Sequence, residues 1–304
     1  MFKRFLVPLD GSNLAEQVLP FAIYLAKQLK ATLILFHVVE KDAPEEVHKQ
    51  HHLREVSEAR TYLKQIADRL SSKGVTILQD VHEVQEVGVA QTIGNHAEEL
   101  KTDLVVLCAH GSSGLRDMIF GSIAQQVIRQ GQIPVLFIRP EFVNDSVVKP
   151  VRKILIPLDG SKQHEVAIPV AVYLAEKFDA EIRLLTVVPT SETLPIKKAI
   201  TTRVSPRAVT ISLDINAQQA EEYLKRISNE INTKGVPVTG VVLRGNTPAM
   251  QIEIINAEDI DLLVMATHGT SALDARWEGS LTPKFLPKTP VPVILVHGTE
   301  QDTT

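Results

Sequence analysis

Two stretches of the chain share a pattern of residues that suits the binding of an anion. They are DLVVLCAHGSSGLRDMIFGS, from Asp103 to Ser122, and DLLVMATHGTSALDARWEGS, from Asp261 to Ser280. In each, an apolar run ends in His-Gly, and a gap of nine residues precedes a Gly-Ser pair. Glycine lets backbone N–H groups approach a ligand, and Gly-Ser at the start of a helix adds free N–H groups, the helix dipole and a hydroxyl. This combination predicts a phosphate site.

A second repeated segment ends in an aspartate. FLVPLDGS covers Phe5 to Ser12, and ILIPLDGS covers Ile154 to Ser161. The carboxylates of Asp10 and Asp159 would repel a phosphate, but they can accept hydrogen bonds from the hydroxyls of a ribose. An aspartate and a glycine loop at the same edge of a sheet would together suit a nucleotide.

The two segments recur in the same order, which indicates an internal duplication. Pro157 follows Pro8 by 149 residues and Gly269 follows Gly111 by 158, so the second copy has gained nine residues between these anchors. Prolines, charges and turn-forming residues lie between the copies, as in linkers. The expected organisation is a first domain over residues 1–141, a linker over 142–150 and a second domain over 151–298.

Apolar runs alternate with helical periods along each copy. In the first copy we expect strands at 5–9, 32–39, 75–81, 104–108 and 135–138, and helices at 12–30, 45–73, 89–100 and 122–130. Buried strands that alternate with helices indicate parallel strands with helices on both faces. The sequence therefore predicts an α/β fold with two tandem, doubly wound, five-stranded parallel sheets. Ligands of such sheets bind at the carboxyl ends of strands where the strand order reverses, and there Asp10 and His110 would meet.

The composition limits the classes of function. The 304 residues are 44% hydrophobic and 22% charged, with a formal net charge of −4, as in an ordinary globular protein. This charge offers no field to gather nucleic acid or an anionic membrane. No apolar run approaches the roughly 20 residues of a membrane span, and the single cysteine, Cys108, excludes a disulfide within the chain. We expect a cytoplasmic protein that binds neither nucleic acid nor membranes.

The two repeated segments together resemble the universal stress protein family. The phosphate loop of that family has two glycines before a nine-residue gap, and a glycine followed by serine or threonine after it. The residues that match are Gly111, Gly121 and Ser122 in the first copy and Gly269, Gly279 and Ser280 in the second. Cys108 and Ala266 stand where the family has its first glycine.

The resemblance implies a Rossmann-like fold of the adenine-nucleotide alpha-hydrolase type, with ATP, alone or with Mg²⁺, as the ligand. Asp10 would meet the ribose, Val39 the adenine, and the loop residues the phosphates. The residues expected in the first site are Pro8, Leu9, Asp10, Val39, Cys108, His110, Gly111, Arg116, Gly121, Ser122 and Ile123. Those expected in a second, weaker site are Pro157, Asp159, Val188, Ala266, His268, Gly269, Gly279 and Ser280. The resemblance also implies that the two domains pair with each other, and it leaves association into a homodimer open.

The second loop is less suited to a phosphate than the first. Glu278 would repel the ligand, although Arg276 offsets part of its charge, and Pro287 should end the following helix almost at once. The first copy keeps Arg116 in its loop and has no proline in the helix after it. We therefore expect the first domain to hold the better nucleotide site.

The function that these residues favour is a nucleotide-binding stress-response or signalling protein rather than an enzyme. No catalytic residues are assigned, because the chain has neither a Gly-x-Ser-x-Gly elbow nor a lysine-containing phosphate loop. Two alternatives remain, a protein-interaction module without a ligand and a slow ATPase or autophosphorylating enzyme. His48 and His52 share a face of the expected helix, which we interpret as a solvated surface rather than a metal site. The segment 189–213 holds the extra residues and is expected to be a mobile surface loop, with a cover over the crevice or a docking segment as alternatives.

Overall fold

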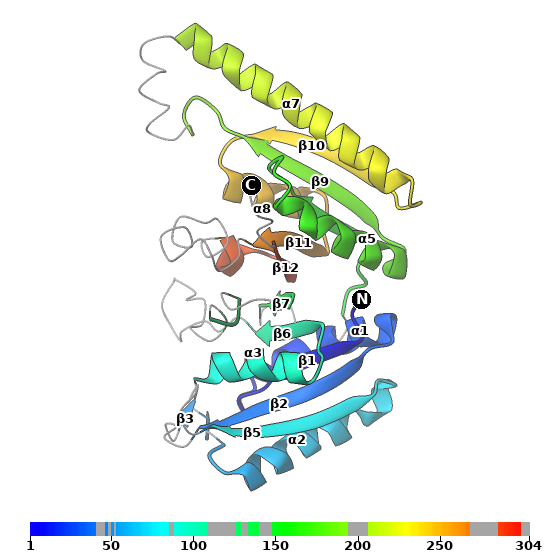
Figure 1. Cartoon of the computed structure of the whole chain (residues 1–304), viewed down its shortest axis with the longest axis vertical. Helices are drawn as coiled ribbons and strands as arrows, with labels where there is room; N and C mark the ends of the chain where they lie inside the picture. The colour runs from blue at the N-terminus through cyan, green and yellow to red at the C-terminus, as the bar shows by residue number, and fades with distance from the viewer. Residues whose placement is uncertain are drawn as a thin grey trace. The chain divides into compact units, whose positions relative to one another are not determined.

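The chain divides into two units, which are shown in Figure 1. The computed structural model describes residues 1–40, 46–47, 50–51, 53–84, 88–108, 124, 126–128, 133–139, 148–193, 206–267 and 285–298. The first unit contains residues 1–149 and takes in residues 292–297 from the end of the chain. The second unit begins at Pro150.

The first unit is built on a parallel sheet. Its parallel strands are β1 (Arg4–Pro8), β2 (Thr32–Glu40), β5 (Ile77–Val84), β6 (Leu104–Cys108) and β7 (Val135–Ile138). They follow the order β7-β6-β1-β2-β5, and every neighbouring pair among them is parallel. The chain moves from β1 to β2 and β5 on one side, and β6 and β7 lie on the other, so the strand order reverses between β1 and β6. The prediction of an α/β fold with parallel strands is confirmed.

Short and regular helices connect these strands. They are η1 (Ala15–Val18), α1 (Leu19–Leu29), α2 (Val56–Leu70), η2 (Ser71–Lys73) and α3 (Val89–Glu99). In α2, Ala59, Leu63, Ile66 and Leu70 form one buried stripe, which is why this segment is a helix that packs on the sheet.

The expected helix from residue 45 to residue 73 is wrong over its first part. A small antiparallel hairpin stands there instead, formed by β3 (Glu46–Val47) and β4 (Gln50–His51). Within the expected helix the apolar stripe begins only at Leu53, because Gln50 and His51, three and four positions after Val47, are both polar. The sequence of this segment therefore lacks the continuous apolar face that stabilises a short helix.

The second unit repeats this plan. Its strands β8 (Lys153–Pro157), β9 (Glu181–Val188), β10 (Val238–Arg244) and β11 (Leu262–Thr267) lie in the order β10-β9-β8-β11, and their neighbouring pairs are parallel. The helices are η4 (His164–Val166), α5 (Ala167–Phe178), α7 (Pro206–Asn232), α8 (Thr247–Ala257) and η6 (Leu286–Lys288). Pro287 lies in the one-turn helix η6, as its restricted backbone allows.

Helix α7 is 27 residues long and begins inside the segment expected to be a loop. It is the long yellow-green helix of Figure 1. Leu213, Ala217, Ala220, Leu224 and Ile227 recur every three or four residues and are buried. This spacing is a helical stripe, so the expectation of a surface loop is wrong for residues 206–213. Among the described residues, no helix combines the length and the apolar composition needed to cross a membrane.

One strand, β12 (Val293–His297), pairs in the antiparallel direction. Its partner is β7, with Ile294 opposite Leu136 at the middle of the register. Ile294 and Leu136 are almost fully buried, so this pairing belongs to the core of the first unit. The last strand of the second sequence copy thus completes the sheet of the first unit.

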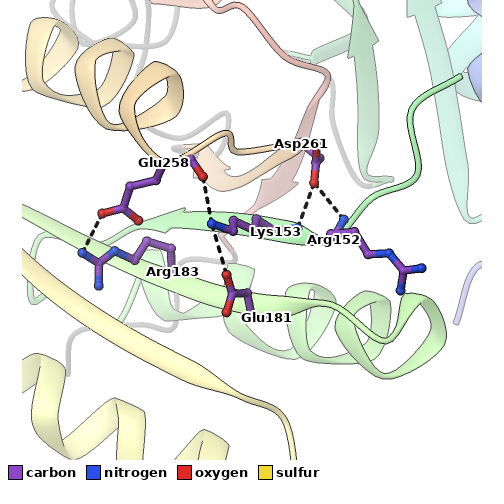
Figure 2. A network of polar contacts seen from close by, with 6 residues as sticks. All are labelled: Arg152, Lys153, Glu181, Arg183, Glu258 and Asp261. Atoms are coloured by element: carbon purple, nitrogen blue, oxygen red, sulfur yellow. Dashed lines mark hydrogen bonds and ion pairs between the residues drawn. The ribbon is translucent and has the colours of Figure 1, made fainter.

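The aspartates that begin the two repeated stretches anchor the first strand of each unit. Asp103 accepts hydrogen bonds from the backbone N–H groups of Lys3 and Arg4, at 2.5 and 3.0 Å. Asp261 accepts the equivalent bonds from Arg152 and Lys153, at 2.8 and 3.0 Å. Figure 2 shows this second clamp within a larger network of Lys153, Glu181, Arg183 and Glu258. The clamps hold the amino ends of β1 and β8, opposite the edge where a ligand is expected.

Candidate functional site

The carboxyl end of β1 carries the aspartate of the first predicted site. Pro8 is the last residue of β1, and the N–H of Leu9 still donates to the carbonyl of Phe36, at 2.8 Å. Oδ1 of Asp10 then accepts hydrogen bonds from the N–H and the hydroxyl of Ser12, at 2.9 and 2.6 Å.

A tight turn follows the aspartate and begins the first helix. Gly11 makes this turn with a φ of +87°, a conformation that glycine adopts without strain. The hydroxyl of Ser12 accepts a hydrogen bond from the N–H of Ala15, at 3.1 Å. Ser12 therefore links the carboxylate of Asp10 to the start of the first helical turn.

Cys108 lies at the end of β6, the strand next to β1. Burial, and next the negative charge of Asp10, raise the pKa of its thiol to about 12. Asp10 follows the carboxyl end of β1 and Cys108 ends the neighbouring strand β6, where the strand order reverses, and the thiol is protonated at neutral pH. Val39, buried near the end of β2, lies one strand away at the same edge.

The described residues of the second copy reproduce this arrangement. Pro157 ends β8, and the N–H of Leu158 donates to the carbonyl of Leu185, at 2.8 Å. Val188 ends β9 and Ala266 is buried near the end of β11.

The aspartate of the second copy has a different partner. Oδ1 of Asp159 accepts a hydrogen bond from the N–H of Ser161, at 2.9 Å, and lies 2.7 Å from Nδ1 of His164. Burial acts to raise the pKa of this carboxyl, but the hydrogen bonds from His164 and Ser161 outweigh it and hold the pKa below its ordinary value. The first copy has Ala15 at the position of His164. The carboxylate of Asp159 is thus bound by an imidazole in addition to its serine, and the alanine of the first copy cannot supply such a bond.

The loops predicted to bind phosphate lie outside the described residues. These are the positions of His110, Gly111, Arg116, Gly121, Ser122 and Ile123 in the first copy and of His268, Gly269, Gly279 and Ser280 in the second. The described part of each site is therefore the end that the ribose and the adenine would meet.

A tyrosine beside each aspartate was not predicted from the sequence. Burial, followed by the charge of Glu16, raises the pKa of the Tyr62 hydroxyl, and the charge of Asp10 adds to the effect. Glu16 also forms an ion pair with Arg69, 53 residues along the chain.

The same trio recurs in the second copy with Tyr223, Glu165 and Arg226, whose guanidinium lies 3.1 Å from the carboxylate of Glu165. The equal spacing of Tyr62 from Gly74 and of Tyr223 from Gly235 was the available signal. In each unit the ion pair between the glutamate and the arginine ties the first 3-10 turn to the next long helix.

Among the described residues, no three or more histidine, cysteine, aspartate or glutamate side chains are arranged to hold a metal ion. His48 and His52 lie outside that part of the chain. The helix on which they would share a face is replaced there by the β3–β4 hairpin.

Comparison with known proteins agrees with this geometry. The model of the universal stress protein family matches residues 1–139 and again residues 150–297. The chain is 31% identical to universal stress protein YxiE of Bacillus subtilis over 151 residues, which cover 46% of this chain and 100% of the relative. It is 22% identical to universal stress protein Slr1230 of Synechocystis over 313 residues, which cover 96% of this chain and 99% of the relative.

A solved structure covers both repeats at once. The crystal structure of a universal stress protein from Archaeoglobus fulgidus matches with a TM-score of 0.72 and 17% identity, over 97% of this chain and 98% of that one. At this identity the match shows the fold, which extends over both copies.

Proposed function

Because the chain belongs to the universal stress protein family, we propose that it binds an adenine nucleotide, ATP, in its first domain. The observation that carries the proposal is the position of Asp10 and Cys108 at the carboxyl ends of two neighbouring parallel strands, where the strand order reverses. Nucleotides bind open parallel sheets at this point. Val39, an apolar residue near the end of β2 on the same edge, would contact the base.

We propose Asp10 as the acceptor of hydrogen bonds from the ribose hydroxyls. Its Oδ1 is held by Ser12, so the direction of the carboxylate is set before a ligand arrives. The loop that contains Gly111, Gly121 and Ser122 would bind the phosphates, with Mg²⁺ accompanying ATP. The domains would extend over residues 1–141 and 151–298, with the linker at 142–150.

The two sites would differ in strength. In the second copy the carboxylate of Asp159 already has an imidazole partner at 2.7 Å, so a ribose hydroxyl would have to compete with His164. Glu278 adds a negative charge to the second phosphate loop. We therefore propose one functional nucleotide site per chain.

Isothermal titration of the full-length chain with MgATP tests the proposal, with Asp10→Ala and Asp159→Ala as a matched pair. The wild-type chain should bind one equivalent. Asp10→Ala should weaken binding about 10- to 150-fold, because a hydrogen bond to a charged group contributes roughly 1.5–3 kcal/mol. Asp159→Ala should bind like the wild type. Stronger dependence on Asp159 than on Asp10 would contradict the assignment of the site.

The alternatives are separated by two further measurements on the wild-type chain. ATP at about 100 times its Kd should stabilise the folded protein by roughly 2.7 kcal/mol. An unchanged melting temperature would instead favour an interaction module that has lost its ligand. Phosphate release that disappears in Asp10→Ala would identify a slow ATPase.

A further inference from the structure

His37 is a buried histidine on β2 to which neither the sequence pattern nor the family resemblance gives a role. Only 1% of its surface is exposed. Nδ1 of its ring lies 2.6 Å from the carbonyl oxygen of Leu9, and Nε2 lies 3.4 Å from the carbonyl oxygen of Leu53. The ring thus lies between the residue before Asp10 and the segment that enters α2.

The short contact fixes the position of a ring proton. A carbonyl oxygen can only accept, so a distance of 2.6 Å requires that Nδ1 carries the hydrogen and donates it. A neutral imidazole has a single N–H, which leaves Nε2 without a hydrogen to donate to Leu53. The Nδ1–H group of His37 therefore holds the carbonyl oxygen of Leu9.

This bond controls the peptide unit that leads into the site. The carbonyl of Leu9 and the N–H of Asp10 belong to the same rigid plane, so the direction of the carbonyl fixes the positions of N and Cα of Asp10, from which its side chain leaves the backbone. The N–H of Leu9 is held by Phe36, and its carbonyl is held by His37. Without the imidazole, this buried carbonyl would lose its partner and would turn toward another donor or water.

The second copy provides an internal comparison. Leu9 and Leu158 make the same strand bond, to Phe36 and to Leu185, so the residues that follow those two correspond. They are His37 and Thr186. Thr186 is 5% exposed, and its hydroxyl has no hydrogen-bond partner among the described residues. The hydrogen bond from His37 to the carbonyl before the aspartate in the first copy thus has no counterpart from Thr186 in the second.

We propose that His37 is a positioning residue of the first nucleotide site, which orients Asp10 through the carbonyl of Leu9. This inference rests on the function proposed above. It does not touch the ligand. Its replacement by Thr186 is one reason why the second site is the weaker one.

Titration of full-length variants with MgATP tests this role. His37→Leu fills the buried space without a donor, and we expect about a 10-fold rise in Kd, equivalent to the loss of one hydrogen bond. His37→Asn places an amide N–H near the position of Nδ1 and should bring the Kd back to within about threefold of the wild type. His37→Gln places its amide near Nε2, away from Leu9, and should not restore binding. Thr186→Val is the matched control and should leave the Kd unchanged.

The pattern of rescue distinguishes positioning from a general loss of packing. A purely structural role would make the Kd follow the melting temperature and would give Asn no advantage over Gln at equal stability. If His37→Leu does not fold, as judged by circular dichroism, the comparison of Asn with Gln carries the test. Equal affinity in those two variants, or a wild-type Kd in His37→Leu, would overturn the proposal.

A ligand-free measurement separates this inference from the proposed function. In ¹⁵N-histidine NMR spectra of the wild-type chain without nucleotide, His37 should be the Nδ1–H tautomer with a slowly exchanging ring proton. An Nε2–H tautomer would overturn the role of His37 and would leave ATP binding intact. A wild-type chain that binds no ATP would overturn the proposed function and the positioning role with it, whatever the tautomer.

Discussion

Replacement of Asp261 by alanine should destabilise the second unit strongly, because this side chain fixes the start of β8 (Figure 2). One carboxylate oxygen accepts two backbone N–H bonds, from Arg152 at 2.8 Å and Lys153 at 3.0 Å. Asp261 is 9% exposed, so water replaces it poorly. At about 1.5 kcal/mol for each hydrogen bond to a charged group, the loss is about 3 kcal/mol, or roughly a 150-fold rise in the opening constant.

Hydrogen exchange followed by mass spectrometry is the appropriate assay, because it reports on each unit separately, whereas a global transition would mix them. Peptides that cover β8 should exchange faster in Asp261→Ala. Asp261→Asn keeps an oxygen acceptor without the charge and should lose about half as much. Asp103→Ala removes the equivalent clamp at a more exposed position, so this variant should lose less stability than Asp261→Ala. A loss below about 1 kcal/mol in Asp261→Ala, or a larger loss in Asp103→Ala, would refute this reasoning.

Three further predictions concern single residues. Gly11→Ala should lower the free energy of unfolding by about 1 kcal/mol more than Gly160→Ala does. Both glycines have a φ of +87°, but only at Gly11 would a Cβ meet Leu53, at 3.0 Å. Urea unfolding measures the difference, and equal losses in the two variants would contradict it. Burial lowers the pKa of His297 to about 4. As the pH falls below 6.5, the imidazole is protonated in the unfolded chain but not in the folded one, so protonation favours unfolding. The free energy of unfolding should therefore fall by up to about 3 kcal/mol from pH 6.5 to pH 4. A His297→Gln variant should lose less over that range, and an unaltered pH profile would show that the group does not contribute. Burial and the charge of Asp10 raise the thiol pKa of Cys108 to about 12. In the folded protein at pH 8 this thiol should therefore react about a thousandfold more slowly than an exposed thiol, and in urea it should react at the ordinary rate. Equal rates for the folded and the unfolded protein in a thiol-labelling time course would disprove this.

The limits of β6 and β7 were predictable because the residues of these strands are apolar throughout. Leu104–Cys108 and Val135–Ile138 begin and end where the sequence indicates, since every residue between these limits is buried. The start of α7 at Pro206 was missed because the sequence around its first turns is rich in prolines, hydroxyls and charges, and its buried stripe begins only at Leu213. Local composition thus dominated the prediction where no apolar stripe indicates a helix.

The candidate site was predictable where residues adjacent in sequence act together. Asp10 with the turn at Gly11 is such a case. The link from Glu16 to Tyr62 and Arg69 joins residues far apart in the chain, so only the packing of helices reveals it. His37 carried a local signal, a lone polar residue inside a strand of buried apolar ones, which requires a hydrogen-bond partner. The identity of that partner, the carbonyl of Leu9, depended on the pairing of β1 with β2.

The antiparallel pairing of β12 with β7 also affects the order of folding during synthesis. Residues 292–297 complete the first unit, yet they leave the ribosome after almost all of the second. At roughly 5–20 residues per second, the about 150 residues between the two strands take roughly 8–30 s to make. During that time β7 presents an unpaired edge, the kind of surface on which chains aggregate. The unit whose synthesis begins first is therefore completed only when almost the whole chain has been made.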